Sequence, residues 1–372
     1  MEYRAISGDS HILEAPGAFQ DRLPAALKEQ GPKIVECEDG GQGWSWEGRK
    51  PRSFGLDAMA GKSDFKEFKD HGLRFSDLRK GNWDGAAHLA DQDIDKVDCS
   101  VLYPGMGLGV ASAVNDRELR LACIRAYNDW ILDEFQGVNP QRLVGLALLP
   151  IDDGMDEILK EFQRVAKKGG RGALLFTYPD KMYTDRYYEP LWAAAQDLQM
   201  PLHFHRSSGK HVPRGTSDVA GKLMVAGIVL RFFAALEPIT HILFTGALHR
   251  YPGLKLVSAE SDAGWVAYYE RLIDDQWKRQ RYWSELELPN PPSEYLRKQI
   301  FFTFMDDEVA CANTRFTGCD NLMWASDYPH SVTTWPKSWD VIKEQTKHNT
   351  PEEREKMLWR NAAKLYRLSA AA

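Results

Sequence analysis

The 372-residue sequence lacks the cysteine patterns of a disulfide framework and of a structural zinc site. Its five cysteines are an odd number and none has C-x-x-C spacing, which favours reduced thiols. The first residues contain no apolar segment of the signal-peptide kind, and no stretch reaches about 18 consecutive apolar residues. We therefore expect a cytoplasmic protein without a membrane partner.

Runs of lysine and arginine interleaved with aromatic residues, which would follow a phosphate backbone, are also missing. The formal net charge is −6 at pH 7, which disfavours binding to nucleic acid. By contrast, the hydrophobic fraction of 43% is ample for a folded core. We expect the partner to be a small-molecule substrate.

Several nucleotide-binding and catalytic motifs are incomplete or absent. In GLDAMAGKS (55–63) the first glycine is one residue too far from Gly61-Lys62-Ser63 for a P-loop. GMGLG (105–109) lacks a third glycine at dinucleotide spacing. Neither G-x-S-x-G nor H-E-x-x-H occurs, which removes the usual sequence support for serine hydrolase and zincin chemistry.

Short apolar segments alternate with longer amphipathic ones, which is the pattern of a parallel sheet built from βα units. The sequence predicts eight strands, over residues 4–9, 99–103, 143–149, 172–177, 201–205, 254–260, 299–305 and 322–327. It predicts helices between them, among others over 116–136, 155–169, 189–199 and 265–281. The segment 239–253 contains a strand-like Ile-Leu-Phe, but a ninth strand would exceed the count, so we assign it to the end of a helix.

The predicted fold class is α/β, a distorted (β/α)₈ TIM barrel in one domain over residues 1–372. Residues 31–85, after the first strand, are rich in glycine, tryptophan and charge and have no clear period. We interpret them as an insertion that forms an active-site lid. We expect Trp44 and Trp46 in this insertion to be core or interface residues, with covering an apolar substrate as the alternative.

Polar residues end several of the apolar strands, and in a (β/α)₈ barrel the active site lies at this edge. Two pairs are spaced two residues apart, so that each pair shares one face of its strand. Buried imidazoles and carboxylates that converge are costly to desolvate unless a divalent cation compensates them. Each residue alone has an ordinary structural explanation, but together they predict a metal site: Asp9, His11, His203, His205, Glu260 and Asp327.

Five ordered motifs resemble the amidohydrolase-2 family, which includes aminocarboxymuconate semialdehyde decarboxylase and resorcylate-type decarboxylases. The resemblance covers about residues 4–368 and implies a metal-dependent enzyme on the same distorted barrel. The motifs are GDSHILEAP, RAYNDW with RLVGLALLP, PLHFH, HRYPGLKLVSAESDAGW and WASDYPH.

The resemblance also implies roles for individual residues. Asp9 and His11 would be ligands from the first strand, His205 a catalytic ligand after the fifth, and Asp327 a ligand that also accepts a proton. His203 would support a ligand or pack in the core. His330 would contact substrate or a ligand carboxylate at the rim.

Glu260 departs from the decarboxylase members, which have a histidine after strand six. The predicted ligands are then three carboxylates and two imidazoles, namely Asp9, His11, His205, Glu260 and Asp327. One divalent ion leaves a formal charge of about −1, and two leave about +1. Zinc is the first candidate, with manganese or iron, as one ion or two, as the alternative.

The leading functional hypothesis is a metal-dependent hydrolase or non-oxidative decarboxylase. It would act on a small aromatic or carboxylated substrate through a metal-activated water or substrate oxygen. One alternative is a dinuclear iron or manganese oxygenase on the same barrel, with Glu260 as a bridging ligand. Another is a non-catalytic subunit of a heteromer, against which the retention of all five ligands argues. The apolar segment MLWRNAAKLYRL predicts a terminal helix that forms a homodimer interface.

Overall fold

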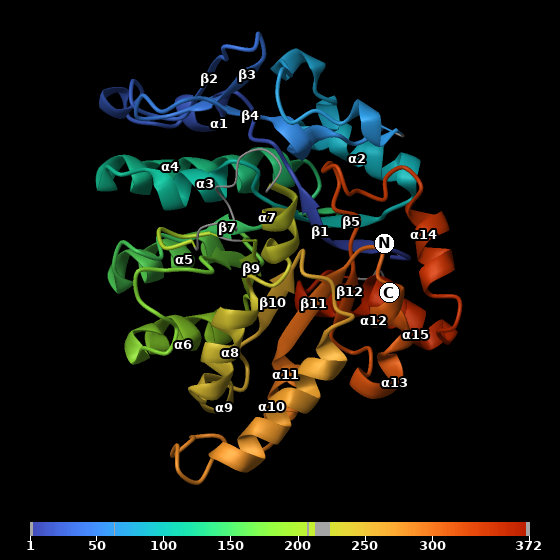
Figure 1. Cartoon of the computed structure of the whole chain (residues 1–372). Helices are drawn as coiled ribbons and strands as arrows, with labels where there is room; N and C mark the ends of the chain where they lie inside the picture. Colours follow the sequence, from blue (N-terminus) through green and yellow to red (C-terminus); the bar gives the residue numbers. More distant parts are fainter. Residues whose placement is uncertain (1–2, 63, 207, 213–223, 370–372) are drawn as a thin grey trace.

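The computed structural model describes residues 3–62, 64–206, 208–212 and 224–369. In this part of the chain, eight parallel strands alternate with helices, as Figure 1 shows. Each strand lies within a predicted range or within two residues of it, so the predicted barrel strands are confirmed. They are β1 (Ile6–His11), β5 (Cys99–Tyr103), β6 (Leu143–Gly145) continued by β7 (Ala147–Leu148), β8 (Ala173–Leu175), β9 (Leu202–His205), β10 (Leu256–Ala259), β11 (Ile300–Phe304) and β12 (Leu322–Trp324).

The strands pair in chain order around the barrel. β1 pairs with β5 and β5 with β6, while β7, β8, β9, β10, β11 and β12 follow one another in the second sheet. The ladder is interrupted between β12 and β1, where backbone hydrogen bonds join the ends instead. Asp327 N donates to Asp9 O at 3.0 Å, and His11 N donates to Tyr328 O at 2.6 Å. These bonds bring the two ends of the predicted site together.

The strands are almost entirely buried because the helices cover their outer face and side chains fill the barrel. The predicted helix over 155–169 is α5, whose first turn holds Asp156 and Glu157 and whose last turn holds Arg164 and Lys167, complementing the helix dipole. The main outer helices are α2 (Gly85–Asp95), α4 (Arg117–Asp129), α5 (Met155–Lys167), α6 (Glu189–Leu198), α8 (Leu236–Phe244), α10 (Val266–Gln280), α11 (Pro292–Gln299) and α14 (Ser338–Gln345). Shorter ones are α1 (Gly17–Gln20), α3 (Gly107–Ala113), α7 (Met224–Arg231), α9 (Ala247–Arg250), α12 (Glu308–Ala312), α13 (Thr314–Thr317), α15 (Pro351–Glu355) and α16 (Asn361–Leu365).

The ambiguous segment 239–253 is helical, as predicted. It contains the end of α8 and all of α9. Ile242 and Leu243 of the strand-like run are fully buried on the inner side of α8. Their burial in the core explains why three successive apolar residues resemble a strand.

The insertion after β1 contains a structure that the sequence did not predict. β2 (Lys33–Glu36), β3 (Gln42–Ser45) and β4 (Arg52–Ser53) form an antiparallel sheet in that order, followed by 3₁₀ turns over Gly55–Ala58, Phe65–Glu67, Phe75–Asp77 and Lys80–Asn82. Trp44 is fully buried against Phe19, and Trp46 is also buried. The alternative that these two tryptophans cover a substrate is therefore wrong, because both belong to the core. In the P-loop-like segment, Ser63 lies outside the described residues.

The terminal segment packs inside its own protomer. A π-helical turn over Lys356–Arg360 joins α15 to α16, and both the turn and α16 contact β1 and β12. Met357, Leu358 and Tyr366 are buried there. The argument that an exposed terminal helix forms a dimer interface is therefore wrong, and the homodimer itself stays a prediction.

One stretch, Val225–Phe244, has the length and composition of a membrane span, and 39% of its most apolar window is buried. It covers α7 and α8, and the apolar side of α8 belongs to the core through Ile239, Ile242 and Leu243. Core helices of water-soluble proteins pass the same test, so the expected lack of a membrane partner stays a prediction. The five cysteines are all free, as expected.

Candidate metal centre and adjoining pocket

The five predicted ligands lie together at the carboxyl ends of the barrel strands. Asp9 and His11 are on β1, where the register against β5 shifts between Ser7 and Ser10. His205 is the last residue of β9 and pairs with Ala259 of β10, so that Glu260 follows beside it. Asp327 lies three residues beyond β12 and is held against β1 by its backbone hydrogen bond to Asp9. Parallel strands bring these ends to one edge.

His11 is at the centre of the cluster. Its Nε2 atom lies 3.4 Å from Asp9 Oδ1, 3.3 Å from Asp327 Oδ1 and 3.1 Å from His205 Nε2. His205 Nε2 is in turn 3.8 Å from Asp9 Oδ1 and 3.0 Å from Glu260 Oε2. Donors around a tetrahedral ion with bonds of about 2.1 Å are separated by about 3.4 Å. The observed separations fit a divalent metal ion.

The carboxylates of the cluster support the same conclusion. Both oxygens of Asp9 and Oδ1 of Asp327 are buried and have no hydrogen-bond partner among the described residues. An unpartnered carboxylate is costly to bury, and a divalent cation removes that cost. Two overlapping groups could hold an ion, one formed by Asp9, His11 and His205, the other by His11, Glu260, Asp327 and His330.

Burial and mutual contact perturb the pKa values of these groups. Burial raises the pKa of Asp9 to about 7 and lowers that of His205 to about 4. Burial also lowers the pKa of His11, but the nearby Asp327 and Asp9 carboxylates, at 3.3 and 3.4 Å, outweigh it and raise the pKa to about 10. The protein without metal thus holds protons within a set of metal ligands, and binding a cation would release them.

Three residues beside or within the cluster have left-handed backbone conformations. Arg206, Glu260 and Asp327 have φ angles of 51°, 49° and 51°. This conformation costs a residue other than glycine about 1–2 kcal/mol. Such strain is concentrated at functional sites, so its occurrence directly after β9, after β10 and just beyond β12 independently marks this edge of the barrel as the site.

Arg206 is the main site residue that the sequence analysis missed. Its guanidinium donates two hydrogen bonds to Glu260, from Nη2 to Oε1 at 2.7 Å and from Nε to Oε2. Burial would raise the pKa of Glu260, but the Arg206 charge outweighs it and holds this pKa well below its usual range. The signal was available, because Arg206 directly follows His205 at the end of a predicted strand.

His330 lies where the resemblance placed it, beside a predicted ligand. Its Nδ1 atom is 3.1 Å from Asp327 Oδ2 and 2.9 Å from Arg206 Nη2. Its ring stacks on His11 with a centroid separation of 3.8 Å. His330 therefore connects the arginine–glutamate pair to the metal-ligand cluster.

His203 points away from the cluster. Its Nδ1 atom lies 2.6 Å from Tyr103 Oη, and the Tyr103 ring stacks on His205 at 4.7 Å. Burial lowers the pKa of His203 to about 3, so the ring is neutral. His203 thus acts on the site only through Tyr103, a residue that the sequence analysis did not identify.

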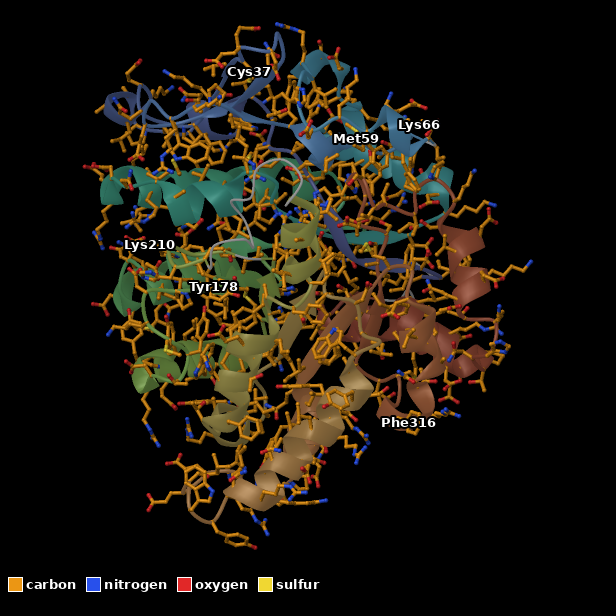
Figure 2. The ribbon with its side chains drawn as sticks, viewed as in Figure 1. Cys37, Met59, Lys66, Tyr178, Lys210 and Phe316 are labelled. Carbon is orange, nitrogen blue, oxygen red and sulfur yellow. The ribbon has the colours of Figure 1, made fainter. Side chains whose placement is uncertain are left out.

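The loop that carries Arg206 is fastened to the loop after β8. Tyr178 N donates to Ser208 O at 2.8 Å, and Lys210 Nζ lies 2.7 Å from Asp180 Oδ2. Figure 2 labels Tyr178 and Lys210 on these neighbouring loops. These contacts restrain Arg206 without using its guanidinium.

A cavity of about 240 Å³ adjoins the cluster. Pockets for drug-sized ligands are usually about 300–1,000 Å³, so this one suits a smaller molecule. Arg206, Glu260 and His330 form the wall at the cluster. The other walls come from the insertion, α7 and the segment after Asp327: Arg52, Ser53, Phe54, Gly55, Leu56, Asp57, Asp70, Ile228, Arg231, Phe232, Ser331 and Val332.

Comparison with known proteins agrees with this fold. The family described as Amidohydrolase matches residues 75–368, and the chain therefore belongs to this family. The resemblance inferred from the five motifs is confirmed. The match begins within the predicted insertion and includes β5 to β12 and the terminal helices.

Four relatives that we compared with this chain share at most 24% sequence identity with it. The decarboxylase orsB of Emericella nidulans is 24% identical over 268 residues, which are 66% of this chain and 76% of orsB. Among solved structures, amidohydrolase map2389c of Mycobacterium avium subsp. paratuberculosis K-10 has a TM-score of 0.78 at 20% identity, covering 98% of this chain and all of that one. LigW, the 5-carboxyvanillate decarboxylase of Sphingomonas paucimobilis, has 0.71 at 19%, covering 99% and 100%. A dihydroxybenzoic acid decarboxylase of Polaromonas sp. JS666 with bound manganese has 0.66 at 15%, covering 100% and 98%. These structures share the barrel fold with this chain.

Proposed function

We propose that this protein is a metal-dependent, non-oxidative decarboxylase of small aromatic carboxylic acids. The observation that carries the proposal is a buried cluster of metal donors beside a cavity of about 240 Å³ with apolar and arginine-bearing walls. Relatives named as decarboxylases support loss of carbon dioxide over hydrolysis.

The ligands we propose are Asp9, His11, His205 and Asp327. A divalent ion bound there would act as a Lewis acid on the oxygen atoms of the substrate. Two carboxylates balance the charge of one divalent ion. Glu260 is then left to Arg206, which already neutralises it through two hydrogen bonds.

This pairing favours one ion over two. A second divalent ion held by Glu260 would lie close to the Arg206 guanidinium. At a separation of about 4 Å and an effective dielectric constant of about 20, the repulsion between +2 and +1 charges is about 8 kcal/mol. The dinuclear oxygenase is therefore the second candidate, and it requires Arg206 to move away from Glu260.

The chain's own residues orient the substrate and handle the proton. When the bond between ring and carboxylate breaks, its electron pair stays on the ring carbon, which must take up one proton as carbon dioxide leaves. The proposed route of that proton runs from solvent to His330 Nδ1, from there to Asp327 Oδ2 at 3.1 Å, and from Asp327 to the ring carbon, so that Asp327 is ionised before and after each turnover. Arg206 Nη2, 2.9 Å from the same nitrogen, holds His330 in place between proton transfers.

The identity of the ion belongs to the same proposal. Zinc was the expectation from the sequence, and manganese is bound in the Polaromonas relative. Imidazole and carboxylate donors accept either ion. We propose one ion per chain, and metal analysis of protein purified without added metal tests both its number and its identity.

The decisive experiment measures carbon dioxide release from a panel of hydroxybenzoates by protein loaded with manganese or zinc. We expect turnover that EDTA abolishes and added metal restores, with about one ion per chain. Asp327→Asn should remove turnover while the fold is retained by circular dichroism. Two iron or manganese ions per chain with oxygen consumption would instead establish the oxygenase, and no bound metal under any condition would contradict both.

The assembly is proposed separately. We infer a homodimer, which is what the resemblance to this family implies, and light scattering of the purified protein at micromolar concentration tests it. A monomer would contradict the homodimer, and copurification with a stoichiometric second chain would support the heteromer.

A further inference from the structure

Helix α7 supplies one wall of the cavity. Ile228, Arg231 and Phe232, from its last turn and the residue after it, line the cavity and are each half-buried. In Figure 1 this helix lies in front of the barrel strands, near the ends of β9 and β10. A ligand in the cavity would therefore contact the Arg231 guanidinium together with the apolar side chains of Ile228 and Phe232.

The arginines of the cavity differ in how their charges are neutralised. Arg206 is paired with Glu260, and Arg52 lies 3.6 Å from Asp57. Within the described part of the chain, no carboxylate oxygen lies within 4.0 Å of Arg231, whose one hydrogen bond there runs from Nε to Gly227 O of its own helix at 3.3 Å. Asp70 also lines the cavity, beside His71, and among the described residues Arg231 is the one arginine of the cavity without a carboxylate partner within 4.0 Å.

The surroundings of Arg231 make its unpaired positive charge costly. Burial and the nearby Arg206 charge both lower the pKa of the Arg231 guanidinium. An arginine nevertheless stays protonated in proteins, so the charge persists and has to be solvated or paired. An anionic group of the ligand would compensate it, and the planar fork of the guanidinium matches a carboxylate.

The apolar side chains define the rest of the ligand. Phe54 and Leu56 of the insertion, Ile228 and Phe232 of α7 and Val332 line the same cavity. Such walls suit a flat ring between two polar ends. The polar groups that face this cavity are the edge of the metal-ligand cluster and Arg231.

We propose that Arg231 is a specificity-determining residue that binds a second anionic group of the substrate. The preferred substrates are then aromatic acids that carry a carboxylate at the metal centre and a further carboxylate or phenolate oxygen at α7. The inference rests on the proposed function, because it takes the metal centre as the place where the first carboxylate binds.

The test compares binding of three probes, benzoate, 3-hydroxybenzoate and isophthalate, by titration calorimetry on manganese-loaded protein at pH 7.5. A hydrogen-bonded charge pair contributes about 1.5–3 kcal/mol, so we expect wild type to bind isophthalate about 10–100-fold tighter than benzoate. Preference for 3-hydroxybenzoate over isophthalate would overturn the inference, because its hydroxyl group is neutral at this pH and the second group would not be an anion. Arg231→Met should lose the preference while its benzoate affinity changes less than about threefold.

Two variants complete the design. Arg231→Lys keeps the charge without the fork and should keep part of the preference, whereas Arg279→Met removes an exposed arginine of α10 and should change nothing. The inference is overturned if wild type binds benzoate and isophthalate equally, or if Arg231→Met weakens both to the same extent. Binding of none of the probes to metal-loaded wild type would contradict the proposed function as well. A wild type that decarboxylates aromatic acids without preferring the second anion contradicts only the inference.

Discussion

Removal of the Arg206 guanidinium should lower the stability of the folded protein, because the Glu260 carboxylate loses its ion-pair partner. In the protein, Arg206 donates two hydrogen bonds to Glu260, and Glu260 Oε2 also lies 3.0 Å from His205 Nε2. The Glu260 side chain is 8% exposed, so water replaces the lost partner only in part. Arg206→Met preserves much of the side-chain volume and leaves a buried carboxylate with no cation but the metal.

The magnitude follows from the cost of breaking a buried ion pair, which is about 3–5 kcal/mol. With an unfolding entropy of about 2.1 cal/mol/K per residue, a chain of 372 residues loses about 4–6 °C in Tm. Glu260→Gln together with Arg206→Met removes the orphaned charge, so the double variant should regain most of this loss. If the Tm changes of the two single variants do not add up to that of the double variant, the two side chains interact as a pair.

The assay is thermal unfolding of manganese-loaded wild type, both single variants and the double variant, with metal content measured on each. We also expect Glu260→Gln to keep about one ion per chain, because Glu260 is the partner of Arg206. The reasoning is refuted if Arg206→Met unfolds within 1 °C of wild type, or if Glu260→Gln loses its metal. The second result would make Glu260 a ligand, as the sequence analysis expected.

Three other predictions concern Tyr103, Asp95 and the metal ion. Tyr103→Phe deletes the hydrogen bond to His203 and leaves that imidazole nitrogen unpaired, which should cost about 1–3 kcal/mol in urea unfolding; a loss below 0.5 kcal/mol would contradict the assigned contact. Burial raises the pKa of Asp95 to about 6, so the folded state binds more protons than the unfolded state between about pH 4 and 6. The Asp95 contribution to stability therefore falls as the pH rises through this range, and Asp95→Asn should flatten that slope in unfolding measured from pH 4 to 8. Chelation should lower Tm and raise it again on metal addition, since the ion binds only the folded chain; an unchanged Tm would contradict the metal centre.

The barrel could be predicted because its strands are short apolar segments flanked by amphipathic helices, and both patterns are local. The ligand cluster could be predicted because Asp9, His11, His205, Glu260 and Asp327 each end or follow such a strand. The sheet in the insertion could not be predicted, since its strands are two to four residues long and too short to show an alternation of apolar and polar residues. The terminal helix was predicted correctly but its role was not, because an apolar face has the same sequence pattern whether it covers the barrel or a second subunit.

Arg206 shows what local patterns omit at a functional site. A charged residue after a strand usually begins a loop. No sequence pattern predicts that the Arg206 guanidinium turns back towards Glu260. That contact changes the charge count on which the choice between one ion and two depends. With Glu260 and Asp57 matched by arginines and two aspartates matched by one ion, the metal end of the cavity attracts a carboxylate by coordination and not by excess charge. Asp70, beside His71, adds a carboxylate to the cavity wall, so the attraction for a further anion comes from the guanidinium of Arg231 itself, which has no carboxylate within 4.0 Å in the described part of the chain. The residues that support the reaction are thus separate from the residue that selects the substrate.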